Sequence, residues 1–211
     1  MNLYHYQKTR HVRTQTPYPY KNFSSFKITL QVEFNNTCVY CRTPHHLSEE
    51  AFYAVEHYRP RKMFPELEND YNNLYYACGH CNSKKSSFWP TDDQLQAGLY
   101  IPNPCEHVMH QHLRASRDGT VEFHSDAGKW TVDLLDLNTP KRVQKKLFYI
   151  RVYLDTKRQV VRYEKLLTKI ASIIEDRNVD TPQNIESLYE RTLTEYEELV
   201  SSLNFLENGS S

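Results

Sequence analysis

Glycine is scarce in this sequence: 211 residues contain only five. Glycine-rich loops bind phosphates because the missing side chain lets backbone N–H groups approach the ligand closely. Neither a Gly-x-Gly-x-x-Gly pattern nor a Walker-type pattern occurs in the chain. The sequence therefore argues against the dinucleotide-binding and phosphate-loop classes.

Long apolar segments are also missing. The mean hydropathy is −0.74, no apolar signal peptide is visible, and no apolar run is long enough to span a bilayer. We therefore expect a cytoplasmic protein without a membrane partner. The length is enough for one or two small domains with a hydrophobic core.

Net charge is absent as well, since 26 basic residues balance 26 acidic ones. The charges are nevertheless segregated: the first 31 residues carry five basic residues and no acid, and residues 141–169 carry ten basic residues against two acids. A zero sum can therefore conceal a basic face. We expect residues 1–25 to form a basic arm that reaches along nucleic acid, with an ordinary chain terminus as the alternative.

Cysteines are few but patterned. Four of the five form two Cys-x-x-Cys pairs, Cys38 with Cys41 and Cys78 with Cys81, and Cys105 stands apart. In a reducing compartment, two such pairs indicate a closed, tetrahedral structural zinc site. The alternatives are two unrelated buried pairs or a redox pair. Cys105 is most simply a small buried hydrophobe.

Hydrophobic patterning predicts an α+β fold with a zinc-stapled ββα core. Alternation over residues 26–34 indicates a strand, and further strands are expected at 51–55 and 74–76, with a loop over 60–72 between them. A helix is expected to start after Cys81. We divide the chain into the arm 1–25, the core 26–95, an extension 96–137 and a C-terminal helical hairpin 138–211.

The extension and the hairpin are predicted from turn and helix signals. We expect a short helix over 106–114 and a β-hairpin made by 120–124 and 129–133. Asn138, Thr139 and Pro140 form a helix start, and Thr181 with Pro182 forms a second one. Apolar residues at helical spacing follow each start, which predicts two antiparallel helices.

Four polar residues within or beside the cysteine pairs suggest phosphodiester hydrolysis. Glu56 can hold a metal ion, and His57, whose pKa lies near neutrality, can activate water. Asn82 directly follows Cys81 and offers an amide oxygen to a hard cation, whereas Asn73 is placed to brace the loop by backbone hydrogen bonds. The candidates for phosphate contacts are Arg59, Lys84 and Lys85.

The order of these residues resembles that of HNH endonucleases, the ββα-metal nucleases. The resemblance is carried by Glu56-His57, then Asn73-Leu74, then Cys78-Gly79-His80-Cys81-Asn82. It implies that His57 is the general base, Asn73 the middle structural residue, and Glu56 and Asn82 the ligands of Mg²⁺ or Mn²⁺. It also implies cleavage that leaves 5′-phosphate and 3′-hydroxyl ends. Here Glu stands where many members have Asp, and the longer 61–72 loop leaves Asn72 as an alternative to Asn73.

A narrower resemblance covers more of the chain. Four segments look like the HNH proteins encoded beside retron and Septu anti-phage systems: Glu56-His57-Tyr58-Arg59-Pro60, Asn103-Pro104-Cys105-Glu106, Gly119-Thr120-Val121 and residues 131–138. It implies a nuclease effector of prokaryotic defence that acts on DNA, or on RNA, together with an ATPase partner docked on the C-terminal helices. The alternatives are a non-catalytic zinc module that binds nucleic acid or protein, and a stand-alone restriction or homing nuclease.

Overall fold

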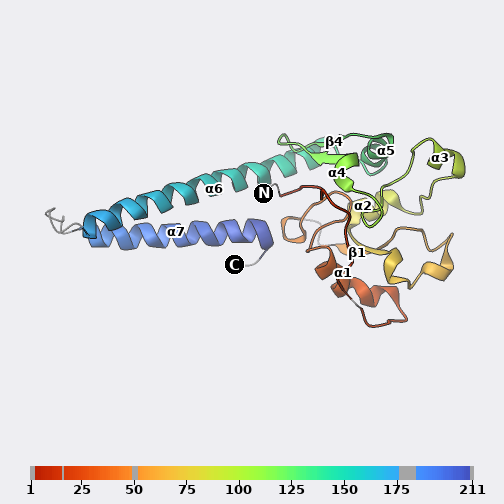
Figure 1. Ribbon diagram of the computed structural model, residues 1–211, viewed down its shortest axis with the longest axis horizontal. Coiled ribbons are helices and arrows are strands. Elements are labelled where there is room, and N and C mark those ends of the chain that lie inside the picture. The colour runs from red at the N-terminus through yellow and green to blue at the C-terminus, as the bar shows by residue number, and fades with distance from the viewer. Residues whose placement is uncertain (1–2, 16, 49–51, 176–183, 210–211) are drawn as a thin grey trace. The chain divides into compact units, whose positions relative to one another are not determined.

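The chain folds as helices combined with two small antiparallel sheets (Figure 1). This computed structural model describes residues 3–15, 17–48, 52–175 and 184–209. Two compact units, Met1–Leu147 and Phe148–Ser211, divide inside the long helix α6. The mixed class and the helical C-terminal part agree with the fold expected from the sequence.

A β-hairpin followed by a short helix forms the centre of the first unit. Strand β1 (Tyr53–His57) pairs antiparallel with β2 (Leu74–Cys78), so that Tyr53 lies opposite Cys78 and His57 opposite Leu74. Helix α2 (Gly79–Lys85) follows β2 without a loop. It begins two residues before Cys81, rather than after it as predicted, because Cys78 adopts an extended conformation as the N-cap. These three elements are the expected ββα arrangement.

The prediction of a strand at residues 26–34 is wrong. After the turn η1 (Phe23–Phe26), the segment forms helix α1 (Lys27–Glu33). Its alternating apolar residues also contain a helical set, because Phe26, Leu30 and Phe34 recur every four residues and are buried. The remaining members, Ile28 and Val32, are exposed. The alternation was therefore a helix face with two apolar residues on its outer side.

Of the two strands predicted for a hairpin at residues 120–133, the first is confirmed and the second is wrong. Strand β4 (Val121–Phe123) pairs with β3 (Leu113–Ala115), and the second predicted strand is instead helix α5 (Asp126–Leu134). Ser125 caps this helix by accepting a hydrogen bond from the backbone N–H of Gly128. A Cβ on Gly128 would lie 2.1 Å from the His112 carbonyl oxygen, so this glycine permits close packing rather than a turn. The helix expected at 106–114 shrinks to α4 (Met109–His112).

Loops connect these elements through short helical turns. Turn η2 (His45–Leu47) follows the first cysteine pair. Turns η3 (Pro65–Leu67) and η4 (Tyr71–Asn73) occupy the segment between β1 and β2, and helix α3 (Asp92–Gln96) follows α2.

Tyrosines build much of the core of the first unit. Tyr53, Tyr75 and Tyr76 come from the hairpin, and each is at most 1% exposed. Their hydroxyl groups still find partners: Tyr53 donates to the Thr43 carbonyl at 2.8 Å, and Tyr75 donates to Asn103 Oδ1 at 2.6 Å. A chain of modest apolar content can thus fill its interior with aromatic rings whose polar ends are satisfied.

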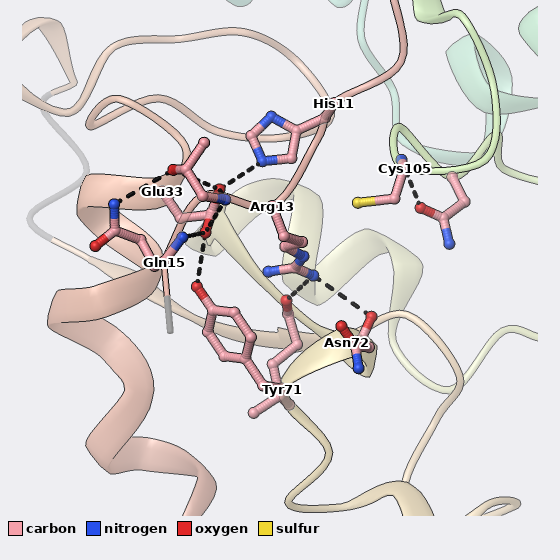
Figure 2. A network of polar contacts seen from close by, with 10 residues as sticks. His11, Arg13, Gln15, Glu33, Tyr71, Asn72 and Cys105 are labelled. Carbon is pink, nitrogen blue, oxygen red and sulfur yellow. Dashed lines mark hydrogen bonds and ion pairs between the residues drawn. The ribbon is translucent and has the colours of Figure 1, made fainter. Parts of the chain in front are cut away.

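The N-terminal segment is fastened to α1 and to the turn before β2 (Figure 2). The buried Glu33 carboxylate accepts hydrogen bonds from the backbone N–H groups of Thr14 and Gln15 and from the Tyr71 hydroxyl, at 2.9–3.0 Å. His11 Nε2 lies 2.9 Å from the same carboxylate. This set of contacts, which we call the Glu33 clamp, fixes residues 11–15 on the unit.

Arg13 of the expected basic arm is part of the interior. Its guanidinium lies over the rings of Phe34, Tyr71 and Tyr75 and donates to the Leu74 carbonyl at 2.8 Å. Lys8 and Arg10, in contrast, are exposed. A nucleic-acid role for the arm stays a prediction that concerns these outer residues.

The second unit consists of the outer part of α6 (Pro140–Glu175) together with α7 (Ile185–Asn208). The Tyr153 hydroxyl contacts Glu207, and the Tyr163 hydroxyl contacts Glu195, so the two helices are antiparallel. Helix α6 begins at Pro140 as predicted, whereas the predicted start at Thr181 and Pro182 lies outside the described residues. None of the helices described is both long and apolar enough to cross a membrane.

Candidate active site and metal centre

The two cysteine pairs meet in one cluster. The sulfur atoms of Cys38, Cys41, Cys78 and Cys81 all lie within 4.8 Å of one another, and the four residues are 0–2% exposed. Cys41 Sγ and Cys78 Sγ are 3.8 Å apart. A tetrahedral zinc ion with Zn–S bonds of about 2.3 Å requires sulfur–sulfur edges of about 3.8 Å. The donor set and this spacing therefore fit a closed, four-sulfur metal site.

Local backbone geometry sets up each pair. In the first pair, the Cys38 N–H donates to the Thr43 carbonyl and the Arg42 N–H donates to the Cys38 carbonyl, with Arg42 in the left-handed region at φ +58°. The second pair spans the junction of β2 and α2, so a strand end supplies one sulfur and a helix the other. A redox pair can also stand at a helix start, but all four sulfurs converge here, which favours metal. Cys105 lies outside the cluster and is partly buried.

Three of the predicted catalytic residues line one hollow. Glu56, His57 and Asn82 surround a space of about 270 Å³, together with Phe23, Arg61 and Lys62 among others. Glu56 and His57 come from the end of β1, and Asn82 comes from the first turns of α2. The ββα arrangement therefore places an acid, an imidazole and an amide beside the same space.

Glu56 is the buried member of this group. Its side chain is 3% exposed, and Oε1 lies 2.6 Å from Lys85 Nζ and 3.4 Å from the Tyr40 hydroxyl. Burial raises the pKa of Glu56, while the neighbouring Lys85 ammonium opposes that rise. Both described contacts fall on Oε1.

His57 is oriented by the loop that follows β1. Its Nε2 lies 2.9 Å from the Glu68 carbonyl oxygen, and the Phe23 ring packs edge-on at 4.8 Å. A carbonyl oxygen can only accept, so Nε2 carries the hydrogen and Nδ1 keeps its lone pair. Burial lowers the pKa of His57, which favours the neutral imidazole. The side chain is therefore set up as a proton acceptor through Nδ1.

Asn73 bridges the chain across the loop, as a bracing residue should. Its Oδ1 accepts from the Arg59 N–H at 2.8 Å, and its Nδ2 donates to the carbonyls of Arg59 and Leu67 at 3.0 and 3.3 Å. Asn73 is buried, whereas Asn72 is exposed. Of the two candidates, only Asn73 has a side chain that bonds the segment immediately after His57.

The three predicted phosphate contacts occupy different environments. Arg59 is exposed, and its guanidinium lies beside the rings of Phe64 and Trp89. Lys84 is also exposed and pairs with Asp136. Lys85 is only 2% exposed, pairs with Glu56 and donates to the His57 carbonyl at 2.8 Å. Its position is thus internal, unlike the surface position expected for a phosphate contact.

Several residues beside the hollow escaped the sequence analysis. Phe23 reaches it from turn η1, and Arg61 and Lys62 reach it from the segment after β1; no spacing rule connects them to Glu56. The burial of Lys85 could have been found, because Lys85 follows Cys81 by four residues and so shares the buried face of α2. Arg142 of α6, which donates to Cys81 Sγ at 4.0 Å, was seen only as part of a basic run.

The comparisons with known proteins agree with this geometry. Residues 38–88 match the family described as HNH endonuclease, a segment that contains both cysteine pairs and most of the hollow. An HNH endonuclease domain therefore occupies this part of the chain.

Two curated relatives extend the comparison. The chain is similar to Septu protein PtuB of Bacillus thuringiensis, at 34% identity over 146 residues, which cover 67% of this chain and 50% of that protein. It is also similar to Septu protein PtuA of Bacillus mycoides (strain KBAB4), at 25% identity over 129 residues, which cover 50% of this chain and 18% of that protein. The chain thus spans half or less of the relatives that it matches.

Proposed function

We propose that this chain is a metal-dependent HNH endonuclease that hydrolyses phosphodiester bonds in DNA, with RNA as the alternative substrate. One observation carries the proposal: Glu56, His57 and Asn82 line a single hollow inside the segment that matches the HNH family. A zinc-binding module without catalysis has no need for an acid, a base and an amide converging in this way.

His57 acts as the general base. Its Nε2–H is held by the Glu68 carbonyl, so Nδ1 is free to take a proton from the attacking water. Asn73 acts as a positioning residue, because its amide fixes the backbone of Arg59 two residues beyond His57. Lys85 holds the Glu56 carboxylate through Oε1 and completes this support.

Glu56 and Asn82 are the proposed ligands of the catalytic cation, Mg²⁺ or Mn²⁺. Lys85 and Tyr40 contact Oε1, which leaves Oε2 of Glu56 for the ion, and Asn82 adds a neutral amide oxygen. When bound, such an ion stabilises charge on the phosphate and on the leaving oxygen. The four cysteines hold a separate zinc ion that fixes the fold around this site.

Exposed cations near the hollow contact the phosphate backbone in this proposal. Arg59, Arg61 and Lys84 are exposed, and Arg61 and Lys62 line the hollow itself. Lys85 is reassigned from a phosphate contact to the internal partner of Glu56, because its ammonium is buried.

The proposed biological setting is supported by the relatives. Similarity to two Septu proteins supports a nuclease effector of prokaryotic anti-phage defence that works in the cytoplasm with an ATPase partner. The outer part of α6 together with α7 is the proposed docking element, since Phe148–Ser211 forms a compact unit of its own.

Plasmid cleavage with Mg²⁺ or Mn²⁺ tests the proposal, with the chain alone and with its ATPase partner added. His57→Ala should lower the cleavage rate by about 10²–10⁴-fold, since general-base catalysis contributes that much. His124→Ala is the matched control, because His124 is exposed and lies outside the hollow. Cleavage undiminished by His57→Ala would refute the mechanism, and nucleic-acid binding without cleavage in both settings would favour the non-catalytic module.

A further inference from the structure

A second cavity borders Cys78 and shares no lining residue with the hollow formed by Glu56, His57 and Asn82. Its volume is about 400 Å³. The first turns of α6 form one wall, and the chain around both cysteine pairs forms the rest. The lining residues are Tyr4, Thr43, Ser48, Cys78, His80, Thr139, Lys141, Arg142, Lys145 and Lys146.

The charge of this lining is one-sided. Four cations from two turns of α6 border the cavity, and none of the described lining residues is a carboxylate. Hydroxyl groups of Thr43, Ser48 and Thr139 supply neutral donors on other sides. Such a set of donors is suited to an anion that accepts several hydrogen bonds at once.

Two of these cations each have a buried nitrogen atom without a hydrogen-bond partner in the described part of the chain, although Arg142 itself is only partly buried. Lys146 is 5% exposed, and its Nζ has no hydrogen-bond partner among the described residues; its nearest aromatic contact is the Tyr4 ring at 5.8 Å. Arg142 Nε also lacks a partner. Burying an ammonium without a compensating acceptor is strongly unfavourable, more so than burying a neutral polar group. A cavity bordered by such groups is therefore incomplete without an anion.

The cysteine cluster accounts for only part of this charge. A zinc ion with four thiolates carries a net charge of −2, and Arg142 reaches Cys81 Sγ at 4.0 Å. Two positive charges would balance that cluster, and the cavity lining carries four cations. Of the four cysteines, only Cys78 borders the cavity, so the space is distinct from the metal position.

We propose that this cavity binds phosphate with two or more negative charges close together. The phosphate belongs either to a nucleic-acid backbone or to a phosphorylated small molecule. Lys146 and Arg142 bind it from within, and Lys141 and Lys145 bind it at the rim. A phosphate presents only acceptors to this donor set when ionised. The site is independent of hydrolysis, because none of the catalytic groups borders it.

Calorimetric titration of the zinc-loaded full chain with pyrophosphate tests the proposal, without any other divalent metal. Wild type should bind in a saturable manner. Lys146→Met and the double variant Lys141→Gln/Lys145→Gln should each weaken binding by about tenfold or more, because one charged hydrogen bond contributes about 1.5–3 kcal/mol. Two controls remove one cation elsewhere: Lys165→Gln on the outer part of α6, and Arg61→Gln at the catalytic hollow.

Zinc content, measured for each variant, separates this role from simple support of the cysteine cluster. Saturable binding that both cavity variants weaken, with zinc retained, supports the proposal. Absence of saturable binding overturns it, as does binding that Arg61→Gln removes and Lys146→Met leaves intact. Loss of zinc in Lys146→Met with unchanged pyrophosphate affinity also overturns it, because Lys146 then serves only the cluster.

A competition experiment identifies the source of the phosphate. A single-stranded oligonucleotide without terminal phosphates is added to the complex of the chain with pyrophosphate. Displacement supports the site as one for backbone phosphates, and retention of pyrophosphate supports a small phosphorylated ligand.

Discussion

The cysteine cluster and the catalytic hollow are neighbouring polar sites of opposite character. The cluster is closed: its four donors are of one kind, are buried, and converge on one another. The hollow is open: its acid, imidazole and amide surround about 270 Å³ of space and face different partners. The difference teaches that one short domain can place a closed set of four sulfurs beside an open hollow, which the proposed function assigns to an exchangeable ion.

A sharp boundary separates the two sites within one helix. Cys81 and Asn82 are consecutive in α2, and successive helical residues point about 100° apart. The first therefore faces the other sulfurs while the second borders the hollow. Whatever fixes Cys81 also fixes the rotation of Asn82.

Cys78→Ser should have the largest effect, because it removes one of four sulfurs from the closed site. Structural zinc contributes about 10 kcal/mol or more of apparent binding free energy, so its loss should unfold the domain. Elemental analysis should fall from one zinc per chain to none, and the thermal transition should be lost. Cys105→Ser is the control and should keep both. An unchanged zinc content in Cys78→Ser would contradict the closed site.

Lys85→Met should come next, because it leaves the Glu56 carboxylate buried without its counter-ion. Breaking such a pair costs about 3–5 kcal/mol in the free energy of unfolding. Urea unfolding should show this loss, and added Mn²⁺ should recover part of it if Glu56 binds the catalytic ion. The double variant Glu56→Gln/Lys85→Met should be less destabilised and insensitive to Mn²⁺. Equal responses of both variants to Mn²⁺ would exclude Glu56 as a ligand.

Asn73→Ala should cost about 1–3 kcal/mol of unfolding free energy, because it leaves two partly buried backbone groups of Arg59 without these hydrogen bonds. The cleavage rate should fall as well, since the backbone after His57 loses its brace. Asn72→Ala is a matched control one residue away, with an exposed side chain. Equal losses in both variants would show that the bridging geometry is unimportant.

Acidification should have the smallest effect, and part of this effect should come from the Glu33 clamp. Burial lowers the pKa of His11 below its ordinary 6.5, although Glu33 opposes this, so the unfolded chain binds the proton first as pH falls. Burial alone would raise the pKa of Glu33, but hydrogen bonds from Thr14, Gln15 and Tyr71 bring it below its ordinary 4.5. Both shifts make stability decrease toward acid: the His11 contribution fades below pH 6.5 and that of Glu33 below 4.5.

Urea unfolding between pH 7 and 4 measures this dependence. His11→Asn should flatten the upper part of the pH profile, and Glu33→Gln should flatten the lower part. A wild-type stability that rises on acidification would contradict both pKa directions.

The parts of the fold that the sequence predicted are those where chemistry fixes the spacing. The spacing of the cysteine pairs predicted the cysteine cluster. Apolar runs on either side of the 58–73 segment predicted strands β1 and β2. The helical C-terminal part was predicted because Pro140 marks a start and apolar residues recur at helical spacing. The roles of the individual site residues remain predictions until the variants are measured.

The parts that the sequence did not predict depend on packing between distant segments. An alternating pattern at residues 26–34 fits a strand and a helix face equally well, and only contact with β1 and β2 selects the helix. Ser125 and Gly128 fit a hairpin turn as well as a helix cap, and the nearby His112 carbonyl decides between them. The cavity beside α6 requires residues from four separate parts of the chain, which no local pattern connects.

Most residues of helix α2 make a specific contact with another part of the first unit. Gly79 packs against the Phe52 carbonyl, and His80 contacts the Leu135 carbonyl. Cys81 belongs to the cysteine cluster and Asn82 borders the hollow, while Lys84 pairs with Asp136 and Lys85 pairs with Glu56. Of the seven residues described for this helix, Ser83 is the exposed one for which no such contact is given. A saturation library across this helix should therefore tolerate variety at one position and reject it at its neighbours. Because the residues of this seven-residue helix contact so many different partners, we expect its sequence to change during evolution only when several partner residues change as well.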